Sequence, residues 1–124
     1  MSKRLGETLV QIYHQQYGVM TNNIRPFNAY GPSTKKTDYR GLPNFGARIM
    51  TGKPLPIYGH GDQTRTFCHV TDAFNGFLRV LLSGIPGEPY NIVNPSPEIS
   101  IKDLPKEISN ALGNKPVAFC IVLP

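Results

Sequence analysis

Apolar side chains recur at helical spacing near the start of the chain. Leu5, Leu9 and Ile12 lie three or four residues apart within residues 3–17, while Arg4, Glu7, Gln11 and Gln15 lie elsewhere on the helix surface. This spacing predicts an amphipathic helix, which Gly18 would end by adopting a positive φ.

The rest of the chain alternates between strand and helix patterns. Alternating or β-branched runs predict strands over residues 19–27, 63–70 and 88–93 and an extended piece over 54–59. A last strand is predicted within 116–124, and we expect the chain to stop before the strand that would pair with it. Helical periodicity predicts helices over 42–52, 73–82 and 104–112, with Thr71 and Asp72 capping the second of these and Pro105 in the first turn of the third. The order predicts a mixed α/β fold.

Composition indicates one small globular domain. The chain has 124 residues, 40% of them hydrophobic, so two independent cores are not expected. Its twelve glycines and twelve prolines predict many turns. Apolar runs are too short to cross a bilayer, Met1 is not followed by a signal-peptide pattern, and Cys68 and Cys120 are interpreted as reduced, buried thiols. We therefore expect a cytoplasmic protein without a membrane partner.

The formal charge of +5 favours anionic ligands, but the cations are scattered. Lys35 and Lys36 form a dense pair, but no basic stripe with interleaved aromatic residues is present, so nucleic acid is not an expected partner. A small diphosphate needs only two or three placed cations and fits this distribution better. No metal-ligand spacing and no glycine-rich phosphate motif occurs, since the "GHGDQT" segment leads into a strand pattern.

The segment "RPFNAYGPSTKKTDYRGLPNF", residues 25–45, has two interpretations. It follows a predicted strand and places an Asn, two Tyr and several cations around Gly-Pro. It could be a solvated connection, or one wall of a site for an anionic ligand that carries a ring.

Four motifs in colinear order favour the second interpretation. "SKRLGE", "RPFNAYGP", "GKPLPIYGHGDQTRTFCHVTDA" and "YNIVNP" resemble the extended short-chain dehydrogenase/reductase family of NAD-dependent nucleotide-sugar epimerases, dehydratases and decarboxylases. The resemblance implies the C-terminal, substrate-binding portion of a Rossmann-type enzyme, without the dinucleotide-binding half. Residues 1–124 are then a single truncated domain: 1–27 end the cofactor domain, 28–113 bind the nucleotide sugar, and 114–124 are a truncated tail.

In that family a Tyr-x-x-x-Lys signature carries the catalysis. The tyrosinate removes a proton from a sugar hydroxyl while hydride passes to NAD, and the lysine lowers the pKa of the phenol and holds the nicotinamide ribose. Lys3 matches the lysine, which puts the tyrosine one position before Met1. The resemblance therefore implies NAD as cofactor of a parent enzyme, and an isolated chain that binds no NAD and is inactive.

The resemblance also assigns binding residues. Pro26 and Phe27 would back the nicotinamide, and Asn28 would donate its amide to the substrate diphosphate. The other implied substrate contacts are the guanidinium groups of Arg40 and Arg65, the nucleobase shelf of Pro56, Ile57 and Tyr58, and Leu42 and Asn91. The motifs are most similar to the UDP-glucuronate decarboxylase and dehydratase branches, followed by the 4-epimerases.

Structural interpretations stand beside these assignments. Arg65 could face water, Asn28 could be a turn residue, Tyr58 a core tyrosine and Lys3 an ordinary helix lysine. The three histidines, His14, His60 and His69, are interpreted as surface, loop and packing residues. The alternative function is a non-catalytic binding or oligomerisation module, because the Leu5–Leu9–Ile12 face of the first helix resembles a family subunit interface and predicts a homodimer or a domain-swapped oligomer.

Overall fold

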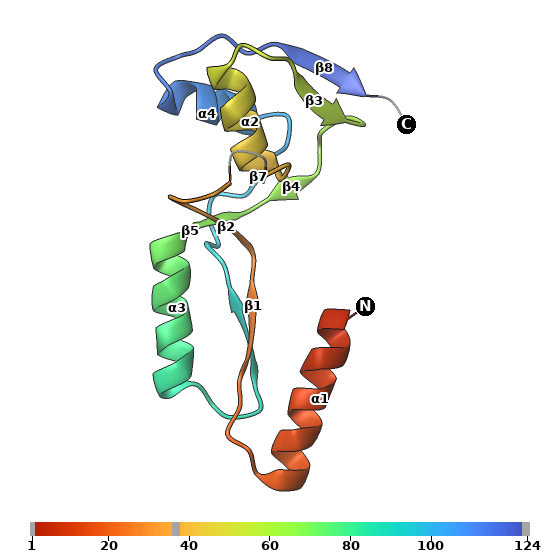
Figure 1. Ribbon diagram of the computed structural model, residues 1–124, viewed down its shortest axis with the longest axis vertical. Coiled ribbons are helices and arrows are strands. Elements are labelled where there is room, and N and C mark those ends of the chain that lie inside the picture. Colours follow the sequence, from red (N-terminus) through yellow and green to blue (C-terminus); the bar gives the residue numbers. More distant parts are fainter. Residues whose placement is uncertain (1, 36–37, 123–124) are drawn as a thin grey trace. The chain divides into compact units, whose positions relative to one another are not determined.

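The computed structural model describes residues 2–35 and 38–122. Its helices are α1 (Ser2–Tyr17), α2 (Gly41–Met50), α3 (Val70–Ser83) and α4 (Leu104–Ala111). Its strands are β1 (Asn23–Pro26), β2 (Asn28–Tyr30), β3 (Leu55–Tyr58), β4 (Thr64–Arg65), β5 (Phe67–His69), β6 (Pro89–Ile92), β7 (Ile99–Ser100) and β8 (Phe119–Val122) (Figure 1). The described residues do not include Met1, the Lys36 of the dense cation pair or the end of the tail.

The chain divides into two compact units. The first comprises Met1–Ala29 and Cys68–Asn94, and the second Tyr30–Phe67 and Pro95–Pro124. Strands β2 and β5 each contain a boundary between them. The predicted domain limits stay a prediction.

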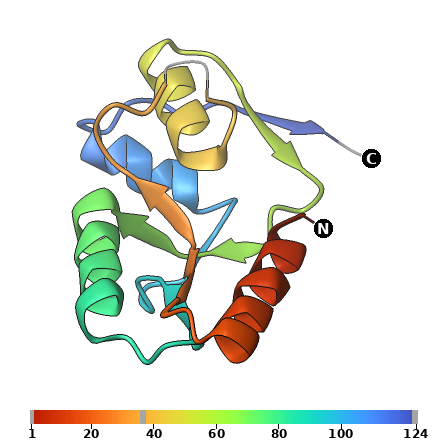
Figure 2. The ribbon, with the colours of Figure 1, turned by 60° about the horizontal axis from the view of Figure 1, so that its bottom comes forward.

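The first unit is built on the parallel pair β1–β6. Its register runs from Asn23 opposite Pro89 to Pro26 opposite Ile92. Helices α1 and α3 flank this pair on opposite sides in both views (Figures 1 and 2). Helix α3 can approach β6 closely because Gly76 has no side chain, and a Cβ built there would lie 3.0 Å from Ile92.

The start of α3 corrects one prediction. His69, and not the Thr71-Asp72 pair, is the N-cap residue, and its ring accepts a hydrogen bond from the main-chain N–H of Thr71. The helix therefore begins at Val70, three residues before the predicted start at Ala73. An imidazole can cap a helix in the same way as a Ser or Asp oxygen, which the preference for small polar caps does not anticipate.

The second unit contains the main hydrophobic cluster. Helices α2 and α4 pack on each other and on β3, and the cluster consists of Phe45, Ile49, Leu55 and Leu104. Strand β3 pairs in parallel with β8, and β4 pairs antiparallel with β7. The last strand thus has a partner, β3, contrary to the expectation that it stops before one.

Other expectations are confirmed or corrected residue by residue. Gly18, Gly52 and Gly113 have φ values of 66°, 66° and 81°, as their predicted role at helix ends requires. Cys68 is buried as predicted, but Cys120 is exposed because β8 has an uncovered face. No helix within the described residues is long and apolar enough to cross a membrane.

Candidate functional site

An ion pair joins α1 to β1 in the first unit. The guanidinium of Arg25 donates from Nε to Glu7 Oε1 at 3.0 Å and from Nη2 to Oε2 at 2.6 Å. These hydrogen bonds lower the pKa of the Glu7 carboxyl and raise that of Arg25. Lys3 lies four residues before Glu7, on the same helix face. The predicted ribose-binding ammonium is therefore carried on the face of α1 that is tied to β1.

The β1–β6 pairing brings three predicted binding residues together. Pro26 lies opposite Ile92, the neighbour of Asn91, and the main-chain N–H of Phe27 donates to Ile92 O at 3.0 Å. The side chain of Phe27 is half exposed and Asn91 is exposed. Asn28 follows at the start of β2 and is exposed as well. The first unit thus presents an aromatic ring and two amides near the end of one strand pair.

Strand β3 has two different faces, which separate the predicted nucleobase shelf. Leu55 and Ile57 are buried, while Tyr58 is 66% exposed and Pro56 is half-buried. Because side chains alternate along a strand, Pro56 and Tyr58 share the outer face and Ile57 points into the core. A ligand on the outer face could therefore reach Ile57 only through its main chain.

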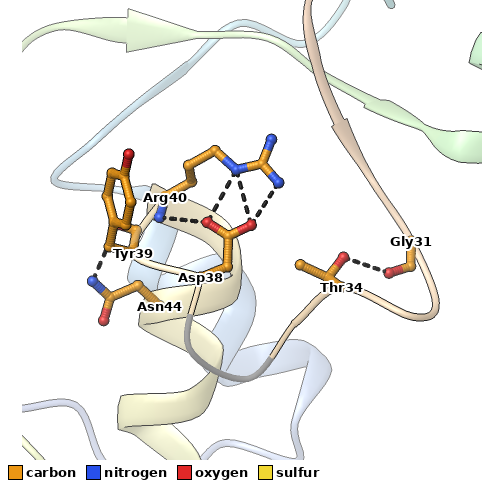
Figure 3. A network of polar contacts seen from close by, with 6 residues as sticks. All are labelled: Gly31, Thr34, Asp38, Tyr39, Arg40 and Asn44. Atoms are coloured by element: carbon orange, nitrogen blue, oxygen red, sulfur yellow. Dashed lines mark hydrogen bonds and ion pairs between the residues drawn. The ribbon is translucent and has the colours of Figure 1, made fainter.

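Arg40 is held by a neighbouring carboxylate in the second unit (Figure 3). Its side chain donates from Nε to Asp38 Oδ2 at 2.9 Å and from Nη2 to the same oxygen at 2.5 Å, and its main-chain N–H donates to Asp38 Oδ1 at 3.0 Å. The Arg40 hydrogen bonds lower the pKa of Asp38 to about 2. Leu42 follows in the first turn of α2, half-buried.

A hollow of about 320 Å³ lies beside this ion pair, lined by Lys35, Asp38, Tyr39 and Arg40. Short-range hydrogen bonds occur in the neighbouring sequence: Thr34 donates to Gly31 O at 2.9 Å, and Asn44 donates to Tyr39 O at 3.3 Å (Figure 3). Among the described residues, its lining includes two cations and one carboxylate.

Arg65 lies on the short strand β4, opposite Ile99 of β7. Its Nη1 donates to the main-chain oxygen of Thr64 at 2.7 Å, and the side chain is exposed. The hydroxyl of Thr64 donates to Glu98 Oε1 at 2.8 Å and ties the two strands together. The guanidinium of Arg65 is therefore held at one nitrogen by a neighbouring main-chain oxygen, on a side chain that is exposed.

The predicted site residues fall into two groups. Those in the first unit are Lys3, Pro26, Phe27, Asn28 and Asn91, and those in the second are Arg40, Leu42, Pro56, Ile57, Tyr58 and Arg65. Their meeting around one diphosphate stays a prediction. Two functional carboxylates were not predicted from the sequence: Glu7, the partner of Arg25, and Asp38, the partner of Arg40. Asp38 could have been found from its position two residues before an arginine.

Metal chemistry receives no support from side-chain geometry. Within residues 2–35 and 38–122, no three His, Cys, Asp or Glu side chains lie close enough together to hold a metal ion.

Comparison with known proteins gives consistent matches. The UDP-glucuronic acid decarboxylase 5 of Arabidopsis thaliana is 38% identical over 111 residues, which are 90% of this chain and 32% of that protein. A dTDP-glucose 4,6-dehydratase from Streptomyces venezuelae, solved with NAD and TYD bound, has a TM-score of 0.82 at 28% identity, covering 94% of this chain and 35% of its own. The UDP-glucuronic acid 4-epimerase of Bacillus cereus, solved with UDP-glucuronic acid and NAD, has a TM-score of 0.83 at 28% identity, with 95% and 37% covered.

The chain thus spans about a third of the length of the relatives that it matches. Its α/β fold matches part of these Rossmann-type extended short-chain dehydrogenase/reductase structures, so the expected fold class is confirmed. The family model of the NAD dependent epimerase/dehydratase family matches residues 1–93. The resemblance of the four motifs is therefore confirmed, and the chain belongs to the NAD dependent epimerase/dehydratase family.

Proposed function

We propose that this chain binds the nucleotide-diphosphate-sugar substrate of an NAD-dependent epimerase, dehydratase or decarboxylase. The observation that carries the proposal is the match of the family model to residues 1–93, which include every predicted binding residue, beside a match to a UDP-glucuronic acid decarboxylase over 90% of the chain. The decarboxylase and dehydratase branches are the preferred ones. A cytoplasmic location belongs to the same proposal.

Each unit contributes groups suited to a part of this ligand. In the second unit, the outer face of β3 offers Pro56 and the ring of Tyr58 to a nucleobase, and Arg65 offers a solvent-facing guanidinium to a diphosphate. Arg40 would have to exchange its hydrogen bonds with Asp38 for bonds to phosphate. In the first unit, Asn28 offers an amide to the diphosphate and Asn91 one to the ribose.

The NAD site of a parent enzyme would draw on the first unit. The half-exposed ring of Phe27 and the position of Lys3 on the face of α1 tied to β1 fit a nicotinamide ribose site. NAD, when bound, accepts a hydride; Lys3 would hold the ribose and favour the ionised form of a nearby phenol. The described residues supply only part of such a site, so the 124-residue chain is proposed to bind no NAD and to be inactive by itself.

Calorimetric titration with UDP and then UDP-glucuronic acid tests the binding proposal. Arg65→Ala should weaken either ligand by about tenfold or more, since hydrogen bonds to charged groups are worth about 1.5–3 kcal/mol. Arg79→Ala is the matched control, because Arg79 is an exposed arginine of α3 without an assigned role. Equal heats from wild type and Arg65→Ala, or no heat with either ligand, would contradict the proposal.

A second function, as an assembly module, is supported by α1. This helix has no buried residue, and Leu5 and Leu9 are 63% and 48% exposed. An apolar helix face of this kind promotes association. We propose that the chain forms a homodimer or a domain-swapped oligomer through α1.

A further inference from the structure

Strand β8 has an uncovered hydrogen-bonding edge. On one side it pairs with β3, where the N–H of Leu55 donates to Ala118 O at 2.9 Å and the N–H of Gly59 donates to Val122 O at 3.2 Å. In the described residues no strand lies on its other side. Main-chain groups of a strand point alternately to its two sides, so those of Phe119 and Ile121 point away from β3.

The side chains beside this edge are apolar. Phe119 lies opposite Leu55, and Ile121 opposite Ile57, so all four side chains project from the same face. Leu55 and Ile57 are buried, but Phe119 is 52% and Ile121 67% exposed. They line a hollow of about 430 Å³ together with Ile57, Gly59, His60 and Lys102.

The sequence of β8 lacks the features that keep strand edges apart. Phe119–Val122 contains no charge, proline or glycine, and none of its residues is buried. The nearest cation of the hollow, Lys102, is engaged with Asp62 at 2.7 Å. An exposed, uncharged and apolar edge of this kind pairs readily with another strand.

We propose that β8 pairs antiparallel with β8 of a second copy of this chain, with Cys120 on the two-fold axis. In this register the outward N–H and C=O of Phe119 bond to the C=O and N–H of Ile121 in the second copy. The outward groups of Ile121 bond in the same way to Phe119 of the second copy, so each outward main-chain group of these two residues has a partner. The Phe119 and Ile121 side chains then meet across the pair on the face of the hollow. A two-fold axis at another residue would not pair Phe119 with Ile121. An axis at Ile121 would place Phe119 opposite residue 123, and an axis at Phe119 would place Ile121 opposite residue 117.

This register predicts a specific covalent link. Two Cys120 residues at the axis form a non-hydrogen-bonded pair with Cα atoms about 4.5 Å apart, within the range of about 4.4–6.8 Å that a disulfide spans. Oxidised glutathione can join them: the two thiols form one disulfide, and the glutathione disulfide is reduced to two thiols. Cys68 is buried and does not compete.

The test combines cross-linking with mass measurement. Wild type should give a disulfide-linked dimer with oxidised glutathione, whereas Cys120→Ser should give none yet keep the dimer by light scattering. The control Cys120→Ser/Val122→Cys carries an exposed thiol on the same strand face. In this register residue 122 lies opposite residue 118 of the second copy, so the thiols of the two copies are four residues apart along the strand and should not link. Equal linking through Val122→Cys, or no linked dimer of wild type, would overturn the proposal.

Ile121→Pro separates this interface from the α1 face. The proline removes the main-chain N–H of residue 121, which points towards the second copy and makes no bond to β3. The dimer dissociation constant should therefore rise by about tenfold or more. Ile121→Lys places a charge at the same edge and should act in the same direction if proline disturbs folding, which circular dichroism would detect. If both variants dimerise as strongly as wild type, the proposal is overturned, and the α1 face remains as the surface that forms the dimer.

Discussion

Glu7 of α1 and Arg25 of β1 hold each other through two hydrogen bonds, of 3.0 and 2.6 Å. A bidentate geometry of this kind fixes orientation as well as distance. Because Lys3 lies one turn before Glu7, the ion pair also sets the direction of the helix end that carries the predicted ribose-binding ammonium.

Replacing Glu7 by Gln should loosen the attachment of α1. The midpoint of urea denaturation should fall modestly, and the difference from wild type should shrink as salt rises, because both side chains are partly exposed. Glu88→Gln is the matched control, since Glu88 is exposed and has no ion pair among the described residues. A salt-independent loss would indicate that packing, not charge, attaches the helix.

Truncating Leu55 should destabilise the second unit strongly. Its side chain is fully buried between β3 and the two helices, so Leu55→Ala should lower the free energy of unfolding by about 2–5 kcal/mol. Leu81→Ala removes the same atoms from a side chain that is 76% exposed, and should change the free energy by less than about 0.5 kcal/mol. Denaturation of both variants under one condition makes the comparison; similar losses would contradict the assigned core.

The Asp38–Arg40 pair should resist acid to an unusual degree. The pKa of Asp38 is lowered from 3.8 to about 2, chiefly by the hydrogen bonds from Arg40. Its stabilising contribution is therefore complete above pH 3.8 and is lost as the pH falls through about 2. NMR titration of the carboxyl carbon should show this midpoint, and in Arg40→Ala it should return towards the ordinary value. A midpoint near 4 in wild type would contradict the pairing.

Replacing Leu9 by Gln should weaken association through α1. The substitution removes an apolar group from the exposed stripe without uncovering a core, because α1 has no buried residue. Light scattering against concentration should show a lower mean mass for Leu9→Gln than for wild type. Gln11→Ala, on another face of the helix, is the control; an equal fall in both, or a wild type that stays monomeric at high concentration, would contradict the assembly role.

Periodicity predicted the helices well and the strand limits poorly. Residues 3–17 were predicted as helix, and Ser2–Tyr17 is one, because Leu5, Leu9 and Ile12 repeat clearly and Gly18 supplies the end. The strand predicted over 19–27 is only Asn23–Pro26. Strand length depends on where a partner such as β6 begins, and this non-local information is absent from a run of apolar residues.

The candidate site shows the same limit. The motifs identified the family, and the rule of alternation could have shown that Ile57 does not share a face with Pro56 and Tyr58. The ion pair of Glu7 was missed because its partner Arg25 is 18 residues away in the sequence. That of Asp38 was missed because a carboxylate near an arginine is common, and only folded geometry shows which ones meet. His69 was overlooked as a helix cap for a related reason, since its ring is seldom used there.

The opposed faces of β3 have a practical implication for engineering. Pro56 and Tyr58 can be exchanged for other side chains without opening a void, whereas Leu55 and Ile57 must be kept. A library confined to the two outward positions would therefore sample new surfaces while every member retains the same interior.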